Sequence, residues 1–260
     1  MDDFLIGLRY SYRGLPWLWR KGVRLFVVVP LLINSLVFAV AIMWAGSNIG
    51  GLVSRIQEAA PDYLDWFVWL LWPVFVLLAL LGLFFGFTLV ANLIGSPFNG
   101  LLAERVERLT DPGGRQPDNL SLATELLRAP LEELRKLLYV VLLAIPLLLL
   151  WLVPPAYPFL PFLWAAFGAW VLALEYLDYP LSNWHLGTRQ QRIMLRKRRM
   201  LALGFGSGIT LLTTIPVLNF VAMPAAVIGG TLLWSEQLKK GVLADRGDDE
   251  ADGNRYDNEP

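Results

Sequence analysis

The stretch LLYVVLLAIPLLLLWLVPPAYPFLPFLWAAFGAWVLALEY (residues 137–176) decides the fold, because it is almost entirely apolar and carries a cluster of prolines near its centre. These are Pro154, Pro155, Pro158 and Pro161, and they divide the stretch into two legs of about sixteen residues. Proline lacks the amide that the interior of an α-helix needs, so the cluster favours a turn between two helices. The stretch therefore predicts a helical hairpin in lipid.

Three further apolar stretches lie outside this hairpin: Leu25–Ala45, Trp66–Ile94 and Leu201–Trp234. The first two are each long enough for one membrane-spanning helix, since about twenty residues at roughly 1.5 Å rise cross a hydrocarbon core of about 30 Å. The second is longer than that and must tilt or protrude from the bilayer. Two long transmembrane helices are therefore expected.

The last apolar stretch predicts a second hairpin. It opens with Gly204, Gly206 and Gly208, which favour close helix contact in a membrane, and it breaks around residues 213–219. Legs of about fourteen residues, or roughly 21 Å, barely reach across a bilayer. Two arrangements stay open for both hairpins. They enter and leave on one face, with irregular backbone buried in protein or lining a wet cavity, or they form further pairs of full spans.

The expected fold class is an all-α integral membrane protein. It has two long transmembrane helices, two helical hairpins that penetrate only partly in the first arrangement, and an N-terminal amphipathic helix. Residues 1–240 are expected to form a single membrane domain. The tail, residues 241–260, is too polar to pack and is expected to be disordered.

The composition agrees with a membrane protein and excludes several kinds of chemistry. Of the 260 residues, 56% are hydrophobic and eleven are tryptophan, and the mean hydropathy is +0.51. One soluble core of this size needs less apolar surface. Cysteine is absent and His185 is the only histidine, which excludes disulfides, thiol catalysis and clusters of cysteine or histidine around a metal. The sequence also lacks a GxxxxGKS or GxxxxGKT loop, so hydrolysis of ATP by the P-loop route is excluded. We therefore expect no enzyme activity, cofactor, metal or nucleic-acid partner.

The basic residues fall on one side of the predicted spans. Lys and Arg number five in residues 1–24, one in 46–65, six in 95–136 and six in 178–200. Cytoplasmic segments of membrane proteins carry the excess of Lys and Arg. The pattern places both termini in the cytoplasm and the loop 46–65 outside.

A short helix is predicted to begin at Ser96-Pro97 and to end at Asp111-Pro112-Gly113. Its apolar stripe consists of Phe98, Leu101, Leu102 and Leu109. At about 100° per residue Arg105 falls inside this stripe. Arg105 either snorkels, with its stem packed and its head in water, or is buried and faces a carboxylate or a passing anion. Glu104 and Arg108, four residues apart, flank it and have the spacing of an ordinary surface pair.

Glu175 is a second charge in an apolar setting, at the end of one leg of the proline-centred hairpin. An ionisable group at membrane depth is costly, so it usually faces a partner or a cavity. We expect Arg105 to be that partner. Glu175 is also the carboxylate to test for proton coupling.

The N-terminal segment combines an apolar stripe with two arginines. On a helix the stripe consists of Phe4, Leu8, Tyr12 and Leu15, and Arg9 and Arg13 stand four residues apart beside it. Two functions stay open. The helix lies on anionic lipid with its arginines at the headgroups, or Gly7 lets backbone N–H groups approach an oxyanion that Arg9 grips with its guanidinium fork.

Four segments together resemble the CysZ-type sulfate permeases of the wider etoposide-induced-protein-like membrane family. They are KGVRLFVVVPLLINSLVF (21–38), SPFNGLLAERVE (96–107), EYLDYPLSNWHL (175–186) and IPVLNFVAMPAAVIGGTLLW (215–234). The resemblance runs in order from about residue 5 to residue 235. It implies long membrane helices with partly penetrating hairpins in a homo-oligomer, in agreement with the pattern above.

The resemblance also implies a function. A Gly-Leu-Arg motif near the N-terminus is associated with sulfate binding in that family, and it corresponds here to Gly7, Leu8 and Arg9. Charged residues near the conduction path correspond to Glu104, Arg105 and Arg108; Arg13 and Glu175 are further candidates on the anion pathway. The expected protein is a bacterial inner-membrane sulfate permease for cysteine biosynthesis that works without ATP, with sulfite and thiosulfate as possible competitors. The alternative is a membrane-organising or interaction protein of the same wider family that transports nothing.

Overall fold

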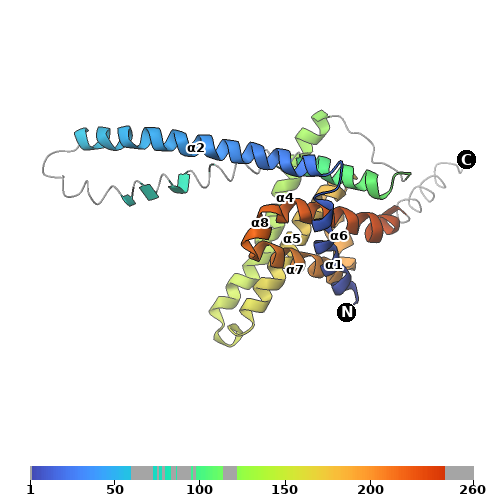
Figure 1. Cartoon of the computed structure of the whole chain (residues 1–260). Helices are drawn as coiled ribbons and strands as arrows, with labels where there is room; N and C mark the ends of the chain where they lie inside the picture. The colour runs from blue at the N-terminus through green and yellow to red at the C-terminus, as the bar shows by residue number, and fades with distance from the viewer. Residues whose placement is uncertain are drawn as a thin grey trace, which may run out of the picture. The chain divides into compact units, whose positions relative to one another are not determined.

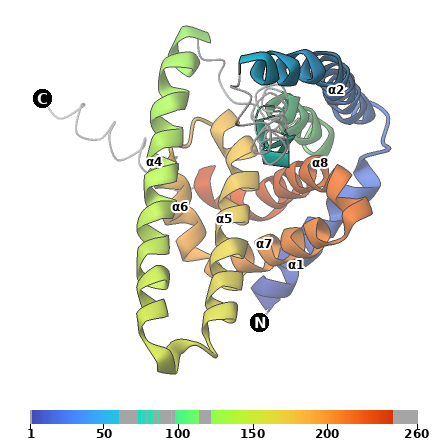
Figure 2. The same ribbon diagram turned by 90° about the vertical axis from the view of Figure 1, so that its left-hand side faces the viewer.

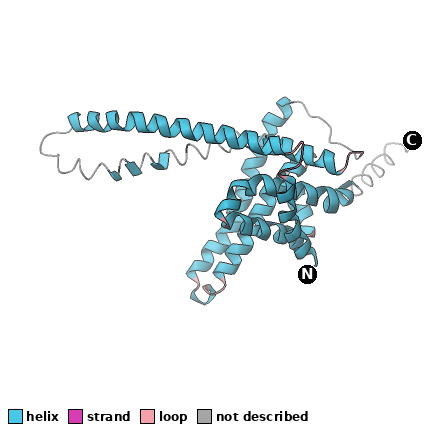
Figure 3. Ribbon diagram, viewed as in Figure 1, coloured by secondary structure: helices cyan, strands magenta, loops and turns pink. Residues whose placement is uncertain are grey.

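The computed structural model describes residues 2–59, 73–74, 76–77, 80–82, 86, 95, 98–113 and 122–243. Within these residues the secondary structure is helical, with turns and short loops between the helices and no strand (Figure 3). Among the described residues, three helices are long and apolar enough to cross a membrane: Arg24–Asn48, Leu131–Leu152 and Leu160–Asn183. The expected class, an all-α membrane protein, is confirmed.

The chain divides into two compact units, residues 25–98 and residues 1–24 with 99–260. Helix α2 (Arg24–Ala59) makes up the described start of the first unit, and its apolar part confirms the long helix expected over Leu25–Ala45. The expected span Trp66–Ile94 lies largely outside the described residues. That the whole of 1–240 forms one membrane domain stays a prediction.

The proline-centred hairpin is confirmed in the second unit. Helices α4 (Leu122–Leu149) and α5 (Leu160–Asn183) run side by side and join at one end through the short 3₁₀ turns η2 (Leu150–Leu152) and η3 (Pro154–Ala156) (Figure 2). The legs, at 28 and 24 residues, are longer than the predicted sixteen. They are longer because both helices continue beyond the apolar run into charged sequence. Each leg is therefore long enough to cross a bilayer by length and composition.

The second hairpin is also confirmed. Helix α7 (Arg199–Thr214) ends one residue before α8 (Pro216–Leu233) begins, and Ile215 between them is extended, with φ −88° and ψ 113°. Proline disfavours the helical conformation in the residue before it, which accounts for the break. With 16 and 18 residues, the legs are only slightly longer than the predicted fourteen.

Two short elements adjoin the hairpins in this unit. Helix α6 (Thr188–Lys197) connects α5 to α7 and lies beside both legs of the first hairpin (Figure 2). The π-helical segment η4 (Trp234–Leu238) follows α8 directly. At the end of α5, His185 has φ 56°, and the amides of His185 and Leu186 donate to the carbonyls of Ser182 and Leu181. This is a Schellman motif, in which the histidine takes the left-handed position that glycine usually occupies.

Helix α1 (Asp2–Trp17) packs across α7 and α8 through glycines (Figure 1). A Cβ on Gly14 would lie 2.8 Å from the carbonyl carbon of Ala225, and one on Gly204 would lie 2.8 Å from the carbonyl carbon of Phe4. A Cβ on Gly206 would lie 2.5 Å from the carbonyl carbon of Ala169 in α5. Such small-residue contacts bring backbones together in membrane proteins. The expected role of the glycines at 204–208 is confirmed.

Helix α1 packs on protein through its small residues. Its buried residues are Gly7, Tyr10, Ser11 and Gly14. The apolar stripe turns away from the protein core, with Tyr12 38% exposed and the other three residues half-buried. The small-residue side of α1 is therefore the side that packs on protein.

Candidate functional site

The Gly-Leu-Arg motif lies in the middle of α1, and its three residues differ in what they contact. Gly7 is buried, and a Cβ there would lie 2.8 Å from the amide nitrogen of Phe205 and 3.0 Å from the carbonyl carbon of Leu201. Inside a helix the amide of residue 7 bonds the carbonyl four residues earlier. The side of Gly7 that a side chain would occupy is filled by α7, so this glycine serves close packing of the two helices.

Leu8 packs on the same neighbour, since a Cβ on Gly208 would lie 3.2 Å from Leu8 Cδ1. Arg9 is the exposed member of the motif, and within the described residues no carboxylate pairs with it. Arg9 alone of the three presents hydrogen-bond donors outward. The geometry therefore supports Arg9 as the group that contacts an anion, on a helix that Gly7 and Leu8 fix in position.

Arg13 is occupied by a partner. Its two terminal nitrogens donate to Glu236 of η4 at 2.7 and 2.9 Å, and its guanidinium lies 4.6 Å from the centre of the Tyr10 ring. The Tyr10 hydroxyl donates to the same carboxylate at 2.5 Å. Burial raises the pKa of Glu236, but the hydrogen bonds from Arg13 and Tyr10 outweigh burial and leave this pKa below its ordinary value. Arg13 thus ties α1 to η4.

A second tie joins the start of α1 to the region between α6 and α7. Arg198 donates to the two carboxylate oxygens of Asp3 at 2.6 and 3.3 Å and to the carbonyl oxygen of Gln237 at 3.1 Å. The hydrogen bond from Arg198 lowers the pKa of Asp3 below its ordinary value. Helix α1 is therefore fixed both by glycine packing and by two ion pairs.

For the helix over residues 98–110, the predicted end and the predicted pair of Glu104 with Arg108 are confirmed, whereas the predicted buried side is not. The turn at residues 111–113 ends the helix as expected, and Glu104 and Arg108 form the expected exposed pair. Ser96-Pro97, the predicted start, lies outside the described residues. The buried side is Leu102, Ala103, Val106 and Glu107, whereas Leu101 and Arg105 are exposed. Of the predicted stripe, Leu102 is on the buried side and Leu101 is exposed; the side that is buried is rotated toward Ala103, Val106 and Glu107.

Glu107 forms a buried ion pair that sequence reasoning missed. Its side chain is 2% exposed and lies 3.0 Å from Nζ of Lys239, which is 4% exposed. Trp184 Nε1 donates to both carboxylate oxygens of Glu107 at 2.9 and 3.0 Å, and Lys239 Nζ lies 4.6 Å from the centre of the Trp184 ring. Asp111 approaches Lys239 at 3.1 Å. No residue spacing signals this pair, because it joins residues far apart in the sequence.

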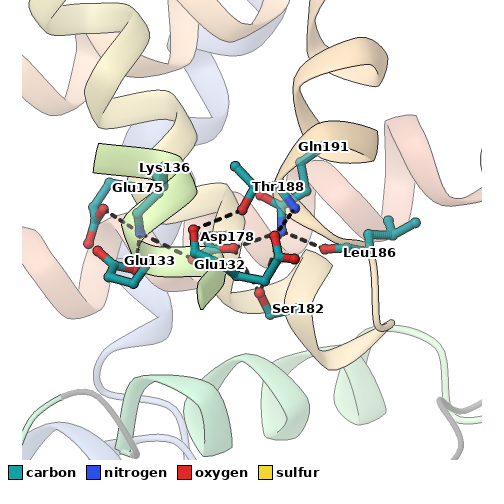
Figure 4. Close-up of polar contacts among 9 residues, drawn as sticks. All are labelled: Glu132, Glu133, Lys136, Glu175, Asp178, Ser182, Leu186, Thr188 and Gln191. Atoms are coloured by element: carbon teal, nitrogen blue, oxygen red, sulfur yellow. Dashed lines mark hydrogen bonds and ion pairs between the residues drawn. The ribbon is translucent and has the colours of Figure 1, made fainter. Parts of the chain in front are cut away.

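Glu175 has a different partner from the one predicted. Lys136 of α4 places its Nζ 3.0 Å from Glu175, 2.9 Å from Glu133 and 3.3 Å from Asp178 (Figure 4). The expected pair of Glu175 with Arg105 is therefore wrong. The Lys136 side chain is only 12% exposed, so one largely buried ammonium compensates three carboxylates where the two legs of the hairpin meet.

Helix α6 is attached to the same end of the hairpin. Asp178 accepts hydrogen bonds from Ser182 and Gln191, both at 2.7 Å, and Gln191 also donates to the carbonyl of Leu186 at 2.9 Å (Figure 4). Glu132 accepts from the amide of Thr188 at 2.9 Å. A carboxylate at the first turn of a helix satisfies a free amide and complements the helix dipole. These contacts give the basic α6 a fixed place beside α4 and α5.

The candidate site residues offer charged side chains and hydrogen-bond donors. Among the described residues no three His, Cys, Asp or Glu side chains cluster as a metal site would need. Arginine forks and ammonium groups suit the binding of oxyanions. Of the predicted arginines, Arg9 and Arg105 are exposed without a carboxylate partner in the described part of the chain, whereas Arg13 and Arg108 are paired.

Comparison with known proteins identifies the family. A family model described as "Sulfate transporter CysZ/Etoposide-induced protein 2.4" matches residues 10–224, a range that begins directly after the Gly-Leu-Arg motif. A protein named "Sulfate transporter CysZ" from Pseudomonas aeruginosa (strain LESB58) is 42% identical over 234 residues, covering 88% of this chain and 94% of that protein. Proteins of the same name from Pectobacterium atrosepticum and Vibrio atlanticus are 38% and 36% identical over 242 residues, covering 92% of this chain and 87% and 96% of those proteins. Because these matches cover most of both chains, this chain belongs to the CysZ/etoposide-induced protein 2.4 family of membrane proteins.

Proposed function

We propose that this protein is a sulfate permease of the bacterial inner membrane that admits sulfate for sulfur assimilation without hydrolysing ATP. The observation that carries the proposal is the 42% identity to a relative that is named as a sulfate transporter, over 94% of that relative's length. The three helices that are long and apolar enough to span a bilayer support it. So does the basic character of the segments expected in the cytoplasm.

In this proposal Gly7, Leu8 and Arg9 form the first sulfate-binding element, with unequal roles. Arg9 supplies the donors, and Gly7 and Leu8 fix α1 against α7 so that Arg9 projects from a rigid support. A tetrahedral dianion gives up its water only to several oriented donors, so Arg9 needs further groups beside it. Arg105 is the exposed candidate further along the pathway, and Glu104, Arg108, Arg13 and Glu175 act through the ion pairs that they form.

The energetics restrict the mechanism. Inward movement of a dianion against an inside-negative potential costs about 2.3 kcal/mol per charge per 100 mV, or about 4.6 kcal/mol in total. At about 1.4 kcal/mol per tenfold, internal sulfate at equilibrium is roughly a thousandfold below external sulfate. Net uptake through a passive permease therefore depends on rapid consumption of sulfate in the cell, and the alternative is proton coupling. Since Glu175 is paired with Lys136, a coupling role for it requires this pair to open.

Three further features belong to the proposal. Both termini lie in the cytoplasm, as the distribution of basic residues predicts. The protein works as a homo-oligomer, as the family resemblance implies. Sulfite and thiosulfate, which are oxyanions of related shape, compete with sulfate for the Arg9 site.

The decisive experiment is radiolabelled sulfate flux into liposomes that contain only this protein. Flux above that of empty liposomes supports a permease, and no flux above empty liposomes refutes it in favour of a membrane-organising protein. Arg9→Ala is expected to weaken sulfate binding at least about tenfold, since hydrogen bonds to a charged group contribute about 1.5–3 kcal/mol. Arg189→Ala, which removes an exposed arginine of α6, is the matched control. Equal sulfate binding by Arg9→Ala and by the unaltered protein would refute the assigned site.

A further inference from the structure

A pocket of about 380 Å³ lies where α4, α5 and α7 meet the end of α6. Leu143, Pro146 and Leu147 of α4 form one side, and Ala166, Phe167 and Trp170 of α5 form the other. Leu203 of α7 completes the apolar wall, and the two charged side chains in the lining are Arg196 and Arg199. The pocket thus joins an apolar wall to a pair of guanidinium groups.

The arginine end of the pocket lies at a defined level of the hairpin. Trp170 Nε1 donates to the Tyr139 hydroxyl at 3.0 Å, which sets these two aromatic residues opposite each other on the two legs. The guanidinium of Arg196 lies 5.9 Å, and that of Arg192 4.4 Å, from the centre of the Tyr139 ring. Tyrosine, tryptophan and arginine together are typical of the boundary between lipid and water.

The apolar wall extends from this level toward the tip of the hairpin. Leu143 and Leu147 follow Tyr139 along α4, and Phe167 precedes Trp170 along α5, which begins at the tip. From Tyr139 to the end of α4 at Leu149, ten residues rise roughly 15 Å, half of a hydrocarbon core of about 30 Å. Large apolar side chains are exposed at the tip, among them Trp151, Leu152 and Phe162. The pocket wall itself, Leu143–Leu147 on α4, covers about 6 Å of this length. The exposed apolar side chains beyond it continue the apolar surface to the tip, so the two together cover about the thickness of one leaflet.

The two arginines have no carboxylate to neutralise them among the described residues. Both are exposed, in contrast to the neighbouring Arg198, which is bound to Asp3. A free inorganic anion would gain nothing from the apolar wall. A phospholipid with a net negative headgroup matches both parts, since guanidinium groups bind phosphate and the wall accepts an acyl chain.

We propose that this pocket binds an anionic phospholipid, with its phosphate on Arg196 and Arg199 and one acyl chain along the wall between the hairpin and Leu203. The lipid fills the space between the first hairpin and α7. It is separate from the proposed sulfate site, because Arg9 lies on α1 and does not line the pocket.

The test measures phospholipid binding to the full-length protein in mild detergent by native mass spectrometry. Phosphatidylglycerol is titrated against phosphatidylcholine, which has the same phosphate diester but no net charge. We expect phosphatidylglycerol to bind more tightly, and the double variant Arg196→Gln/Arg199→Gln to weaken its binding about tenfold or more. Arg189→Gln, on the same helix but outside the pocket, is expected to leave binding unchanged. Ala166→Trp fills the wall without a change of charge and is expected to weaken the binding of both lipids.

Two controls distinguish lipid binding from misfolding of a variant and from binding of a free oxyanion. Thermal unfolding in phosphatidylcholine identifies a variant that is misfolded, and in that case Arg199→Gln alone replaces the double variant. Sulfate and chloride are compared at equal ionic strength; we expect neither to displace phosphatidylglycerol more than the other. Equal phosphatidylglycerol binding by the folded arginine variants and Arg189→Gln would overturn the proposal. Specific displacement by sulfate would overturn it too, because the arginines would then form a site for free oxyanions. Neither result bears on flux through Arg9.

Discussion

The Gly-Leu-Arg motif provides the sharpest test of the structure, because substitution of its glycine and of its arginine should impair the protein in different ways. Gly7→Ala adds one methyl group where α1 meets the backbone of α7, 2.8 Å from the amide nitrogen of Phe205. A backbone neighbour cannot rotate away as a side chain can. The helices must separate to accept the methyl group. Arg9→Ala, by contrast, removes an exposed side chain that contacts no carboxylate in the described residues.

Two opposing terms decide the size of the effect at Gly7. Alanine is about 1 kcal/mol more favourable than glycine inside a helix. Overpacking of a well-packed contact costs about 1–3 kcal/mol, and a rigid backbone neighbour places Gly7 at the upper end of this range. The expected net loss of unfolding free energy is about 1–2 kcal/mol. For a chain of this size that lowers the melting temperature by about 2–8 °C.

Thermal unfolding in detergent, followed by circular dichroism, measures this loss. Gly168→Ala is the matched control, since Gly168 lies inside α5 and a Cβ there meets nothing within 4 Å. It should gain the helix-propensity term without the overpacking. Arg9→Ala should unfold at the temperature of the unaltered protein while losing sulfate binding. If Gly7→Ala is as stable as Gly168→Ala and yet fails to bind sulfate, Gly7 acts on the anion directly and the packing argument is refuted.

Three other predictions concern the ion pairs. The pKa of Glu236 in the folded protein lies below its ordinary value of 4.5, so the pair with Arg13 stabilises the fold above that pH, and this stabilisation is lost as the pH falls below it. In a plot of melting temperature against pH, Glu236→Gln should therefore reduce the fall of the melting temperature at acid pH; an unchanged fall would contradict the pair. Glu107→Gln should lower the unfolding free energy in a denaturant titration by about 2 kcal/mol, because Lys239 loses its buried carboxylate and keeps the more exposed Asp111. Glu107→Gln/Lys239→Met should regain part of that loss; losses that simply add would show the two residues to be uncoupled. Lys136→Met should destabilise the hairpin by about 1–2 kcal/mol in the same titration, since three carboxylates lose their shared cation but remain partly exposed to solvent. Lys136→Arg should retain most of the stability; equal losses would mean that packing, not charge, matters there.

The hairpins were predictable from the sequence because proline acts locally. Pro154 and Pro155 end the first leg, and Pro216 forces the residue before it out of the helix, wherever the rest of the chain lies. The lengths of the legs were less predictable. An apolar run marks the part of a helix that lipid favours, whereas α4 and α5 continue into charged sequence that is stabilised by contacts between the two legs.

Partners of buried charges could not be predicted in the same way. Lys136 and Glu175 are 39 positions apart in the numbering of the chain, and Glu107 and Lys239 are 132 apart. A pattern in one helix shows that a charge needs a partner but not which distant residue supplies it. The choice of Arg105 for Glu175 failed for this reason, and the same limit concealed Lys239.

The packed side of α1 follows from the solvent that surrounds a membrane protein. In water, an apolar stripe marks the side of a helix that packs on protein, because burial of apolar surface drives folding. In lipid that drive between helices is absent, and close backbone contact through small residues takes its place. On α1 the packed side is therefore marked by Gly7, Ser11 and Gly14, and the apolar stripe is only partly covered by protein: Leu8 touches α7 and Tyr12 is exposed. Gly7 and Arg9 are two residues apart in the sequence and therefore about 200° apart around the helix, so they lie on different sides of it. The membrane fold thus divides a motif that the sequence predicts to be one anion-binding unit into a packed glycine, Gly7, and an exposed arginine, Arg9. Under the proposed function their substitutions should therefore be separable in stability and in sulfate affinity.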